Sequence, residues 1–234
     1  MKIALLGYGK MGKVIEKIAL QRGHDIILKV DKNTSSFDIS LAEIAIDFSV
    51  PSVAVANISN CLQHGIPVIS GTTGWLDDYD SVTDLCLEKN GAFIYASNFS
   101  LGVNIFFELN KYLAKMMTNL SQYNVSIEEI HHTQKLDAPS GTAITLAEGI
   151  IKNSNYKNWK LGVTNNANEI PIEAKRIENI SGTHSINYES KVDSLNITHT
   201  AHNRDGFALG AIIAAEWLLN KKGVFTMNDV LNIG

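Results

Sequence analysis

Cysteines are scarce in this chain of 234 residues, in which Cys61 and Cys86 are the two thiols. They form no CxxC pair, and neither has a histidine at metal-ligand spacing. This pattern fits neither a disulfide framework nor a cysteine-based metal centre, so we expect a reduced, cytoplasmic protein.

Basic tracts and long apolar runs are also missing. Lys+Arg number 20 against 24 Asp+Glu, for a formal net charge of −4, and no basic segment is present to attract nucleic acid. No segment approaches the roughly 20 consecutive apolar residues of a membrane helix. Gly7, Gly9 and Lys10 interrupt the apolar start of the chain, which is expected to form a strand rather than a targeting signal. Neither nucleic acid nor a membrane is an expected partner.

Hydrophobic residues, in contrast, make up 45% of the chain and charged residues 19%. This composition supports a sizeable core and excludes a disordered chain. The length fits one large domain or two small ones, because a typical domain has roughly 100 to 200 residues.

Short apolar runs alternate with helical patterns in the first part of the chain. Strands are expected at residues 2–6, 26–30, 44–48, 67–69 and 92–95, and helices at 13–21, 52–62 and 79–89. Because parallel neighbours need crossover connections, this alternation predicts an α/β fold of the Rossmann type, with a doubly wound parallel sheet.

The pattern changes after Asn98. Helices are expected at 103–117 and 140–151, the second capped by Ser140, and strands at 124–130, 172–178, 184–189 and 194–201, with an exposed polar loop at 153–168. Partial alternation of apolar and polar residues favours a second α+β domain on a mixed or largely antiparallel sheet, half covered by helices. Asp205 is the expected cap of a final helix at 206–219. That helix is apolar nearly all round, so we expect it to be buried and to return to the first domain.

A glycine turn, Gly7-Tyr8-Gly9-Lys10-Met11-Gly12, separates the first predicted strand from the first helix. It fits GxGxxG, whose glycines let backbone N–H groups approach a pyrophosphate at a helix N-terminus. Asp31 ends the second strand, where a ribose-binding carboxylate is expected. The alternative is a plain glycine turn, with Asp31 capping a strand.

Asp31 and its neighbour Lys32 leave the choice of dinucleotide open. An aspartate repels a 2′-phosphate while a lysine could attract one, so both NADH and NADPH are compatible with the pair. Lys32 is equally well explained as a solvated surface lysine.

Two further segments follow predicted strands, Gly71-Thr72-Thr73-Gly74 and Ala96-Ser97-Asn98-Phe99-Ser100. In an open parallel sheet a ligand lies outside the carboxyl ends of the strands, so both segments lie where a nicotinamide and its ribose would bind. Taken alone, each is more often a connecting turn.

Segment 129–143, EIHHTQKLDAPSGTA, contains the most reactive side chains. His131, His132 and Lys135 gather potential positive charge and proton donors just before a helix N-terminus. The N–H groups of Gly141 and Thr142 fall in the first helical turn, where they lack intrahelical partners and can bind a carboxylate. The segment therefore predicts a small anionic substrate.

Two other interpretations of this segment are a metal site and a purely structural element. Adjacent histidines on a strand point in different directions, only Asp137 or Glu129 could assist them, and HExxH is absent, so we expect no metal. The segment could also be a polar strand end followed by an ordinary capped helix.

Together the motifs resemble the 4-hydroxy-tetrahydrodipicolinate reductase (dihydrodipicolinate reductase) family over the whole chain. The resemblance rests on GYGKMG at 7–12, DFSVP at 47–51, GTTGW at 71–75, ASNFSLGVN at 96–104, the segment 129–143, GTH at 182–184 and ITHTAHNRDGFALGA at 197–211. Of these, HHxxKxDAPSGTA is highly specific to the family.

The resemblance implies an oxidoreductase that moves a hydride from NADH or NADPH to a small cyclic dicarboxylate, 4-hydroxy-tetrahydrodipicolinate, and gives tetrahydrodipicolinate for lysine biosynthesis through diaminopimelate. It implies a dinucleotide-binding domain at 1–100 and 204–234 and a substrate-binding and oligomerisation domain at 101–203. A homotetramer is implied as well, and a sheet without helices on both faces fits pairing with other subunits.

By motif position the resemblance also implies residue roles. His131 matches the proposed proton donor or acceptor, Lys135 a second acid, and His132 a substrate contact, while Gly141 and Thr142 match the pair that binds a substrate carboxylate. The implied cofactor contacts, with Lys32 as a further candidate beside Asp31, are Gly7, Tyr8, Gly9, Lys10, Met11, Gly12, Asp31, Gly71, Thr72, Thr73, Ala96, Ser97, Asn98 and Phe99. Whether His131 or Lys135 delivers the proton stays open.

Two other classes of protein would keep part of the pattern. A different two-domain dehydrogenase, for an amino or hydroxy acid, would keep the glycine turn but need not contain HHxxKxDAPSGTA. A nucleotide-sensing protein without catalysis would keep the cofactor motifs and lose Lys135 or the two histidines, which are all present here.

Overall fold

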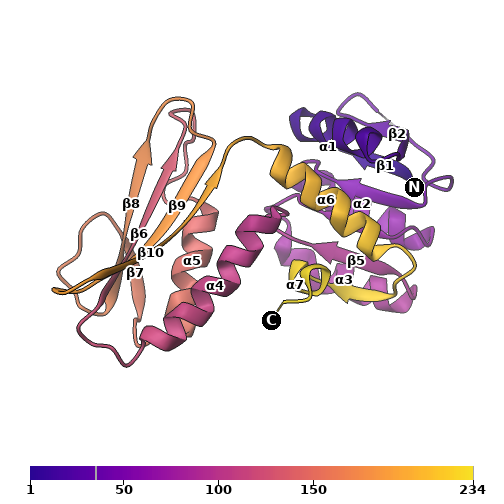
Figure 1. Ribbon diagram of the computed structural model, residues 1–234. Helices are drawn as coiled ribbons and strands as arrows, with labels where there is room; N and C mark the ends of the chain where they lie inside the picture. Colours follow the sequence, from indigo (N-terminus) through magenta and orange to yellow (C-terminus); the bar gives the residue numbers. More distant parts are fainter. Residues whose placement is uncertain (35, 234) are drawn as a thin grey trace. The chain divides into compact units, whose positions relative to one another are not determined.

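Two β-sheets organise the chain in the computed structural model, which describes residues 1–34 and 36–233 (Figure 1). The sheets belong to separate units. The first unit is Met1–Leu101 together with Arg204–Gly234, and the second is Gly102–Asn203.

The first unit contains a six-stranded parallel sheet in the order β11-β5-β4-β3-β1-β2. Its strands are β1 (Lys2–Leu6), β2 (Asp25–Val30), β3 (Ile44–Asp47), β4 (Val68–Ser70), β5 (Ala92–Tyr95) and β11 (Gly223–Phe225). Its helices are α1 (Lys10–Gln21), α2 (Pro51–Gln63), α3 (Tyr79–Glu88), α6 (Asp205–Leu218) and α7 (Met227–Leu231), with a 3₁₀ turn η1 at Leu76–Asp78. The predicted parallel sheet of the Rossmann type is confirmed.

Alternating side chains build a core on each face of this sheet. Ile3 and Leu5 of β1 pack with buried residues of α1 and α6 on one face. Ala4 and Leu6 of the same strand pack with α2 and α3 on the other face. Because successive side chains of a strand point to opposite faces, burial on both sides accounts for the continuous apolar runs.

The strand order reverses beside β1, which pairs with β2 on one side and β3 on the other. At such a switch point the loops after the two diverging strands separate, and α/β sheets bind ligands there. The glycine turn after β1 and the loop after β3 are therefore the expected ligand edge of the first unit.

The second unit contains a five-stranded mixed sheet in the order β10-β9-β6-β8-β7. Its strands are β6 (Asn124–His131), β7 (Asn158–Leu161), β8 (Glu169–Arg176), β9 (Gly182–Glu189) and β10 (Ser194–Ala201). Strands β6, β7 and β8 run parallel, whereas β9 is antiparallel to both β6 and β10. Helices α4 (Leu101–Met117) and α5 (Gly141–Lys152) lie side by side on one face, where their buried residues and those of the sheet form one core (Figure 1). The predicted mixed, half-covered sheet is confirmed.

Two predictions at the level of single elements are wrong, and two short elements were missed. Strand β7 lies inside the expected loop at 153–168, because pairing with β8 makes a strand of a segment without a clear strand pattern. Arg204 rather than Asp205 is the N-cap of α6, and Asp205 is the first helical residue. Strand β11 and helix α7, of 3 and 5 residues, were not predicted.

Among the described residues, no helix combines the length and the apolar character needed to cross a membrane.

Candidate active site

The glycine turn after β1 packs against neighbouring backbone in the first unit. Gly7 has a φ of +99°, and a Cβ there would lie 2.2 Å from the carbonyl oxygen of Phe48. A Cβ on Gly12 would lie 2.7 Å from the carbonyl oxygen of Gly7. The turn therefore requires glycine at both positions, whereas nothing lies within 4 Å of a Cβ position at Gly9.

The first turn of α1 leaves backbone N–H groups available for an anion. Gly9 precedes the helix, and its carbonyl accepts the first helical hydrogen bond, from the N–H of Lys13. The N–H groups of Lys10, Met11 and Gly12 therefore lack intrahelical acceptors. Within the described chain, no side chain caps this end of α1 and no acidic residue lies in its first turn. The positive end of the helix can therefore face a phosphate.

Tyr8, Asp31 and Lys32 are the other candidates near this turn. The Tyr8 hydroxyl donates to the carboxylate of Glu16 on α1. Asp31 follows β2 directly and is exposed, as is Lys32. The Oδ1 atom of Asp31 accepts from the N–H of Asn33 at 2.9 Å. The carboxylate is thus held by its own turn at the solvent-facing end of β2, a placement that suits a ribose contact.

Asp47, the last residue of β3, is a buried carboxylate that sequence reasoning did not single out. It accepts hydrogen bonds from the side chains of Asn57, Ser70 and Thr72 at 3.1, 2.9 and 2.7 Å. Burial raises the pKa of Asp47, and these donors oppose that shift. Asp47 therefore anchors the loop after β4, and the Thr72 hydroxyl takes part in that anchoring.

The other loop candidates of the first unit fall into two groups. Those with at least partial exposure are Gly71, Thr73, Ala96, Ser97 and Asn98. Phe99 is buried, with its ring centroid 5.8 Å from that of Phe48. The Phe99 side chain belongs to the core of this unit, which leaves its backbone as the candidate cofactor contact.

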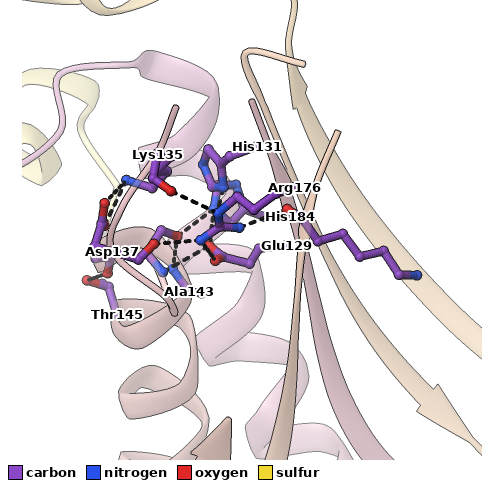
Figure 2. Close-up of polar contacts among 11 residues, drawn as sticks. Glu129, His131, Lys135, Asp137, Ala143, Thr145, Arg176 and His184 are labelled. Carbon is purple, nitrogen blue, oxygen red and sulfur yellow. Dashed lines mark hydrogen bonds and ion pairs between the residues drawn. The ribbon is translucent and has the colours of Figure 1, made fainter. Parts of the chain in front are cut away.

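In the second unit, strand register brings ionisable side chains to one end of the sheet (Figure 2). Strand β8 places Arg176 opposite His131 of β6, and β9 places His184 opposite Glu129. Glu129 and His131 share a face with the buried apolar residues of β6, because side chains alternate along a strand. This is the face that α4 and α5 cover.

Glu129 is the centre of this group and is fully buried. Its carboxylate accepts from Nη2 of Arg176 and from the N–H of Ser140, each at 3.0 Å. Nδ1 of His131 and Nε2 of His184 lie 3.4 and 3.7 Å from Oε2. A buried carboxylate remains charged only with such partners.

His131 and His184 pack edge to face, with ring centroids 5.0 Å apart. Burial lowers the pKa of His131, and the Glu129 charge opposes this shift. Burial also lowers the pKa of His184, to about 4. Both imidazoles are therefore mostly uncharged at neutral pH. The Nε2 atom of His184 hydrogen-bonds to the hydroxyl of Ser140 at 3.1 Å.

Lys135 lies on loop 132–140, which connects β6 with α5. Its ammonium pairs with Asp137 at 2.8 Å, and 23% of its side chain is exposed. This hydrogen bond lowers the pKa of Asp137. Arg176 donates to the carbonyls of Lys135 and Asp137, at 3.3 and 2.5 Å. Arg176 thus holds the backbone of the loop, while the Lys135 ammonium stays accessible.

His132 begins the same loop and is partly buried. Its Nδ1 atom is buried and has no hydrogen-bond partner in the described part of the chain. A buried polar atom without a partner is rare in proteins. His132 therefore retains hydrogen-bonding capacity for a ligand.

Helix α5 begins where this loop ends. The Ser140 hydroxyl accepts from the N–H of Ala143 at 3.2 Å, so the predicted cap is confirmed. The next N–H, of Ile144, bonds to the Ser140 carbonyl. The N–H groups of Gly141 and Thr142 therefore lack intrahelical acceptors. No atom lies within 4 Å of a Cβ position at Gly141, so an anion can approach this helix end.

Glu129, His131 and His184 each offer a potential metal-ligand atom, and the three atoms lie within 4.8 Å of one another. A cation there would lie beside the guanidinium of Arg176, which already neutralises Glu129. The N–H of Ser140 also occupies a carboxylate oxygen. The group fits a hydrogen-bonded cluster better than a metal centre.

The predicted site residues divide between the units. The cofactor candidates lie on the first unit, and His131, His132, Lys135, Gly141 and Thr142 lie on the second. Sequence reasoning missed Arg176 and His184 as neighbours of this segment, and it considered Glu129 only as an assisting metal ligand. The GTH motif at 182–184 was the one signal for His184, and nothing in the local sequence marked Arg176.

The parallel sheet and its glycine turn define a class of protein, one with a Rossmann-type nucleotide-binding unit. Family models described as the N-terminus and the C-terminus of dihydrodipicolinate reductase match residues 1–99 and 102–231. The chain belongs to the dihydrodipicolinate reductase family.

Individual relatives agree with this membership. The 4-hydroxy-tetrahydrodipicolinate reductase of Christiangramia forsetii is 58% identical over 235 residues, which cover 99% of this chain and 98% of that protein. The enzyme of the same name from Methanococcoides burtonii is 33% identical and covers 95% of each chain. The dipicolinate-bound dihydrodipicolinate reductase from Paenisporosarcina sp. TG-14 has the same fold, with a TM-score of 0.77, 22% identity and 97% coverage of each chain.

Proposed function

We propose that this chain catalyses the NAD(P)H-dependent reduction of 4-hydroxy-tetrahydrodipicolinate to tetrahydrodipicolinate in the diaminopimelate route to lysine. The observation that carries the proposal is that loop 132–140, which carries the Lys135 ammonium, leads directly into the start of α5, where the N–H groups of Gly141 and Thr142 lack intrahelical acceptors. Family membership and the names of the relatives support it.

A dicarboxylate needs cationic or N–H partners on both of its ends. Gly141 and Thr142 offer two backbone N–H groups and a hydroxyl to one carboxylate. Lys135 offers its ammonium, which is now paired with Asp137 and exchanges that partner for the substrate. His132, with a buried nitrogen that lacks a partner, supplies a further polar contact.

The proton that accompanies hydride transfer comes from Lys135 in this proposal. Burial lowers the pKa of His131, so its imidazole is mostly uncharged at neutral pH and carries no additional proton to donate. The Lys135 ammonium is accessible and is stabilised by Asp137. His131 then acts through hydrogen bonding and its place beside the loop.

The cofactor supplies the hydride. The first turn of α1, with its N–H groups at Lys10, Met11 and Gly12, fits a pyrophosphate, and the close contacts of Gly7 and Gly12 leave the turn no room for larger side chains. The exposed Asp31 serves the ribose hydroxyls, and Lys32 beside it meets a 2′-phosphate. We propose that both NADH and NADPH are used.

The uncovered face of the second sheet suits assembly into a homotetramer. Helices α4 and α5 cover one face. Side chains that alternate with the core residues, such as Thr198 and Ser185, hydrogen-bond to each other on the opposite face, at 2.9 Å. Pairing of such faces between copies gives a closed symmetric assembly.

The two cysteines indicate the kind of cellular compartment in which the protein works. Both Cys61 and Cys86 are buried free thiols, and burial raises the pKa of each, which keeps them protonated and unreactive. Structural thiols of this kind fit a reducing compartment, and we propose the cytoplasm.

The proposed activity is tested by following the oxidation of NADH and NADPH through the absorbance of the reduced nicotinamide, with freshly generated 4-hydroxy-tetrahydrodipicolinate. We expect substrate-dependent oxidation of the cofactor. Oxidation with an amino or hydroxy acid pair instead would favour another dehydrogenase, and cofactor binding without turnover would favour a nucleotide sensor.

A further inference from the structure

Glu129 is the least exposed ionisable group of the second unit's cluster, yet the proposed chemistry gives it no direct part. It is fully buried, and its two oxygens meet the guanidinium of Arg176 and the backbone N–H of Ser140. Taking a carboxylate out of water is costly unless all its oxygens find partners. An apolar residue at this position could not accept the hydrogen bonds from Arg176 and Ser140, so the carboxylate has a role that burial alone does not explain.

The two hydrogen-bond partners of Glu129, Ser140 and Arg176, both hold loop 132–140. Ser140 ends the loop and caps α5, and Glu129 fixes its backbone. Arg176, neutralised by Glu129, reaches across the loop and donates to the carbonyls of Lys135 and Asp137. Figure 2 shows these contacts converging on the guanidinium. The placement of the Lys135 backbone thus depends on the Glu129 carboxylate, which is not one of the proposed substrate-binding groups.

The same carboxylate also acts on the buried histidines. Its negative charge opposes the lowering of the pKa of His131 by burial. Nδ1 of His131, 3.4 Å from Oε2, is buried without a hydrogen-bond partner in the described residues. Glu129 is therefore the acceptor toward which a protonated His131 would orient.

We propose that Glu129, with Arg176, is a positioning residue: the pair fixes loop 132–140, so that Lys135 and the start of α5 present their donors together, and the Glu129 carboxylate lies 3.4 Å from Nδ1 of His131. The inference deepens the proposed function and rests on it for the identity of the substrate. Neither residue contacts substrate in this proposal, so both act through their neighbours.

Glu129→Gln is the first test, because it keeps the shape and removes the charge. A glutamine presents one oxygen, so either Arg176 or Ser140 loses its acceptor. We expect the affinity for dipicolinate, used as an unreactive dicarboxylate probe, to fall at least about tenfold, as for a lost hydrogen bond to a charged group. The Kd for NADH should stay unchanged. In NMR titrations the pKa of His131 should move lower than in the unmodified protein, because the stabilising charge is gone.

Glu128→Gln is the matched control. Glu128 is the preceding residue on β6, points to the opposite face and pairs with Lys175. Its substitution should leave dipicolinate affinity and the His131 titration unchanged. A Glu129→Gln protein that binds dipicolinate and titrates His131 like the Glu128→Gln protein would overturn the proposal.

Arg176→Lys separates positioning from simple loss of fold. Lysine keeps the charge but cannot hold the carboxylate and two carbonyls at once. We expect weaker dipicolinate binding and a lower kcat, with circular dichroism and melting temperature close to those of the unmodified protein. If Glu129→Gln fails to fold, this variant decides, and unchanged binding and turnover would refute the proposal. The pKa of His131 is measured without turnover. This test of the positioning role therefore remains valid even if the unmodified protein fails to reduce the proposed substrate.

Discussion

Lys135 combines a fixed backbone with an accessible ammonium. Arg176 donates to its carbonyl, and Asp137 pairs with its ammonium. Such an ion pair, exposed on one side, exchanges partners at little cost because surface pairs contribute little stability. Its position on the loop that leads into α5, where the N–H groups of Gly141 and Thr142 lack intrahelical acceptors, lets one residue both bind a carboxylate and give up a proton.

We expect Lys135→Ala to lower kcat at least about a hundredfold, since losing a general acid costs about 10²- to 10⁴-fold. The KM for the dicarboxylate should rise, as the loss of a charge-assisted contact weakens binding by roughly 1.5 to 3 kcal/mol. NADH affinity should stay within a few-fold, which steady-state kinetics and fluorescence titration would check. Lys111→Ala, which breaks the Lys111–Glu108 pair on α4, is the control. Near-normal turnover of Lys135→Ala would overturn its assignment, and an equal loss of NADH binding would point to misfolding.

Asp31 is the residue at which NADH and NADPH should differ. Asp31→Ala removes the carboxylate that we place at the ribose hydroxyls, so NADH should bind more weakly while NADPH is affected less, because a 2′-phosphate gains from the lost negative charge. Isothermal titration with both cofactors measures this difference.

Asp38→Ala is the matched control for Asp31→Ala. Asp38 is also exposed and also closes a turn, by accepting from the N–H of Ser40 at 2.8 Å. It should alter the affinity for neither cofactor. Equal losses for NADH and NADPH in Asp31→Ala would show that Asp31 is a structural turn residue.

Among the secondary-structure elements, the start of α5 contributes both to the stability of the second unit and to the geometry of the proposed site. Ser140 caps the helix through its hydroxyl, hydrogen-bonds to Nε2 of His184 through the same hydroxyl, and donates its N–H to Glu129. One residue therefore connects α5 with β6 and β9. The cap fixes where the free N–H groups of the first turn point.

Ser140→Ala should lower the free energy of unfolding by about 1 kcal/mol, the usual value of a side-chain cap. Urea unfolding monitored by circular dichroism measures the loss. Thr145→Ala is the comparison, since the Thr145 hydroxyl only returns to the Gly141 carbonyl within the same helix, at 3.0 Å. If both variants lose the same stability, the Ser140 hydroxyl is not acting as a cap.

For the whole molecule, the open face of the second sheet predicts assembly. We expect a homotetramer by light scattering at micromolar concentration, and a monomer there would contradict the proposal. Thr198→Lys places a charge on the open face and should shift the assembly toward smaller species. Ser121→Lys, at an exposed turn between α4 and β6, should leave the mass unchanged.

Much of the fold could be read from local patterns. The runs at β1 and β3 are apolar on both faces, and the period of α1 identifies its buried side, so strand, turn and helix followed one another as expected. The boundaries of the elements were predicted less accurately. Helix α1 begins at Lys10 rather than at residue 13, because the helix starts inside the glycine turn. Short elements such as β7 and β11 were missed, since they are formed by pairing with a neighbouring strand rather than by their own pattern.

Local sequence was enough to predict the alternating strands and helices of the first unit, the glycine turn, the capped start of α5 and the segment with His131 and Lys135, because each of these depends on residues close together in the chain. Tertiary structure alone decided that Arg176 and His184 join Glu129. They come from β8 and β9, which the register of the sheet places beside β6. A one-residue shift in that register would turn these side chains to the opposite face. The chemistry of the segment could therefore be predicted locally, but the buried charges that hold it in place could not.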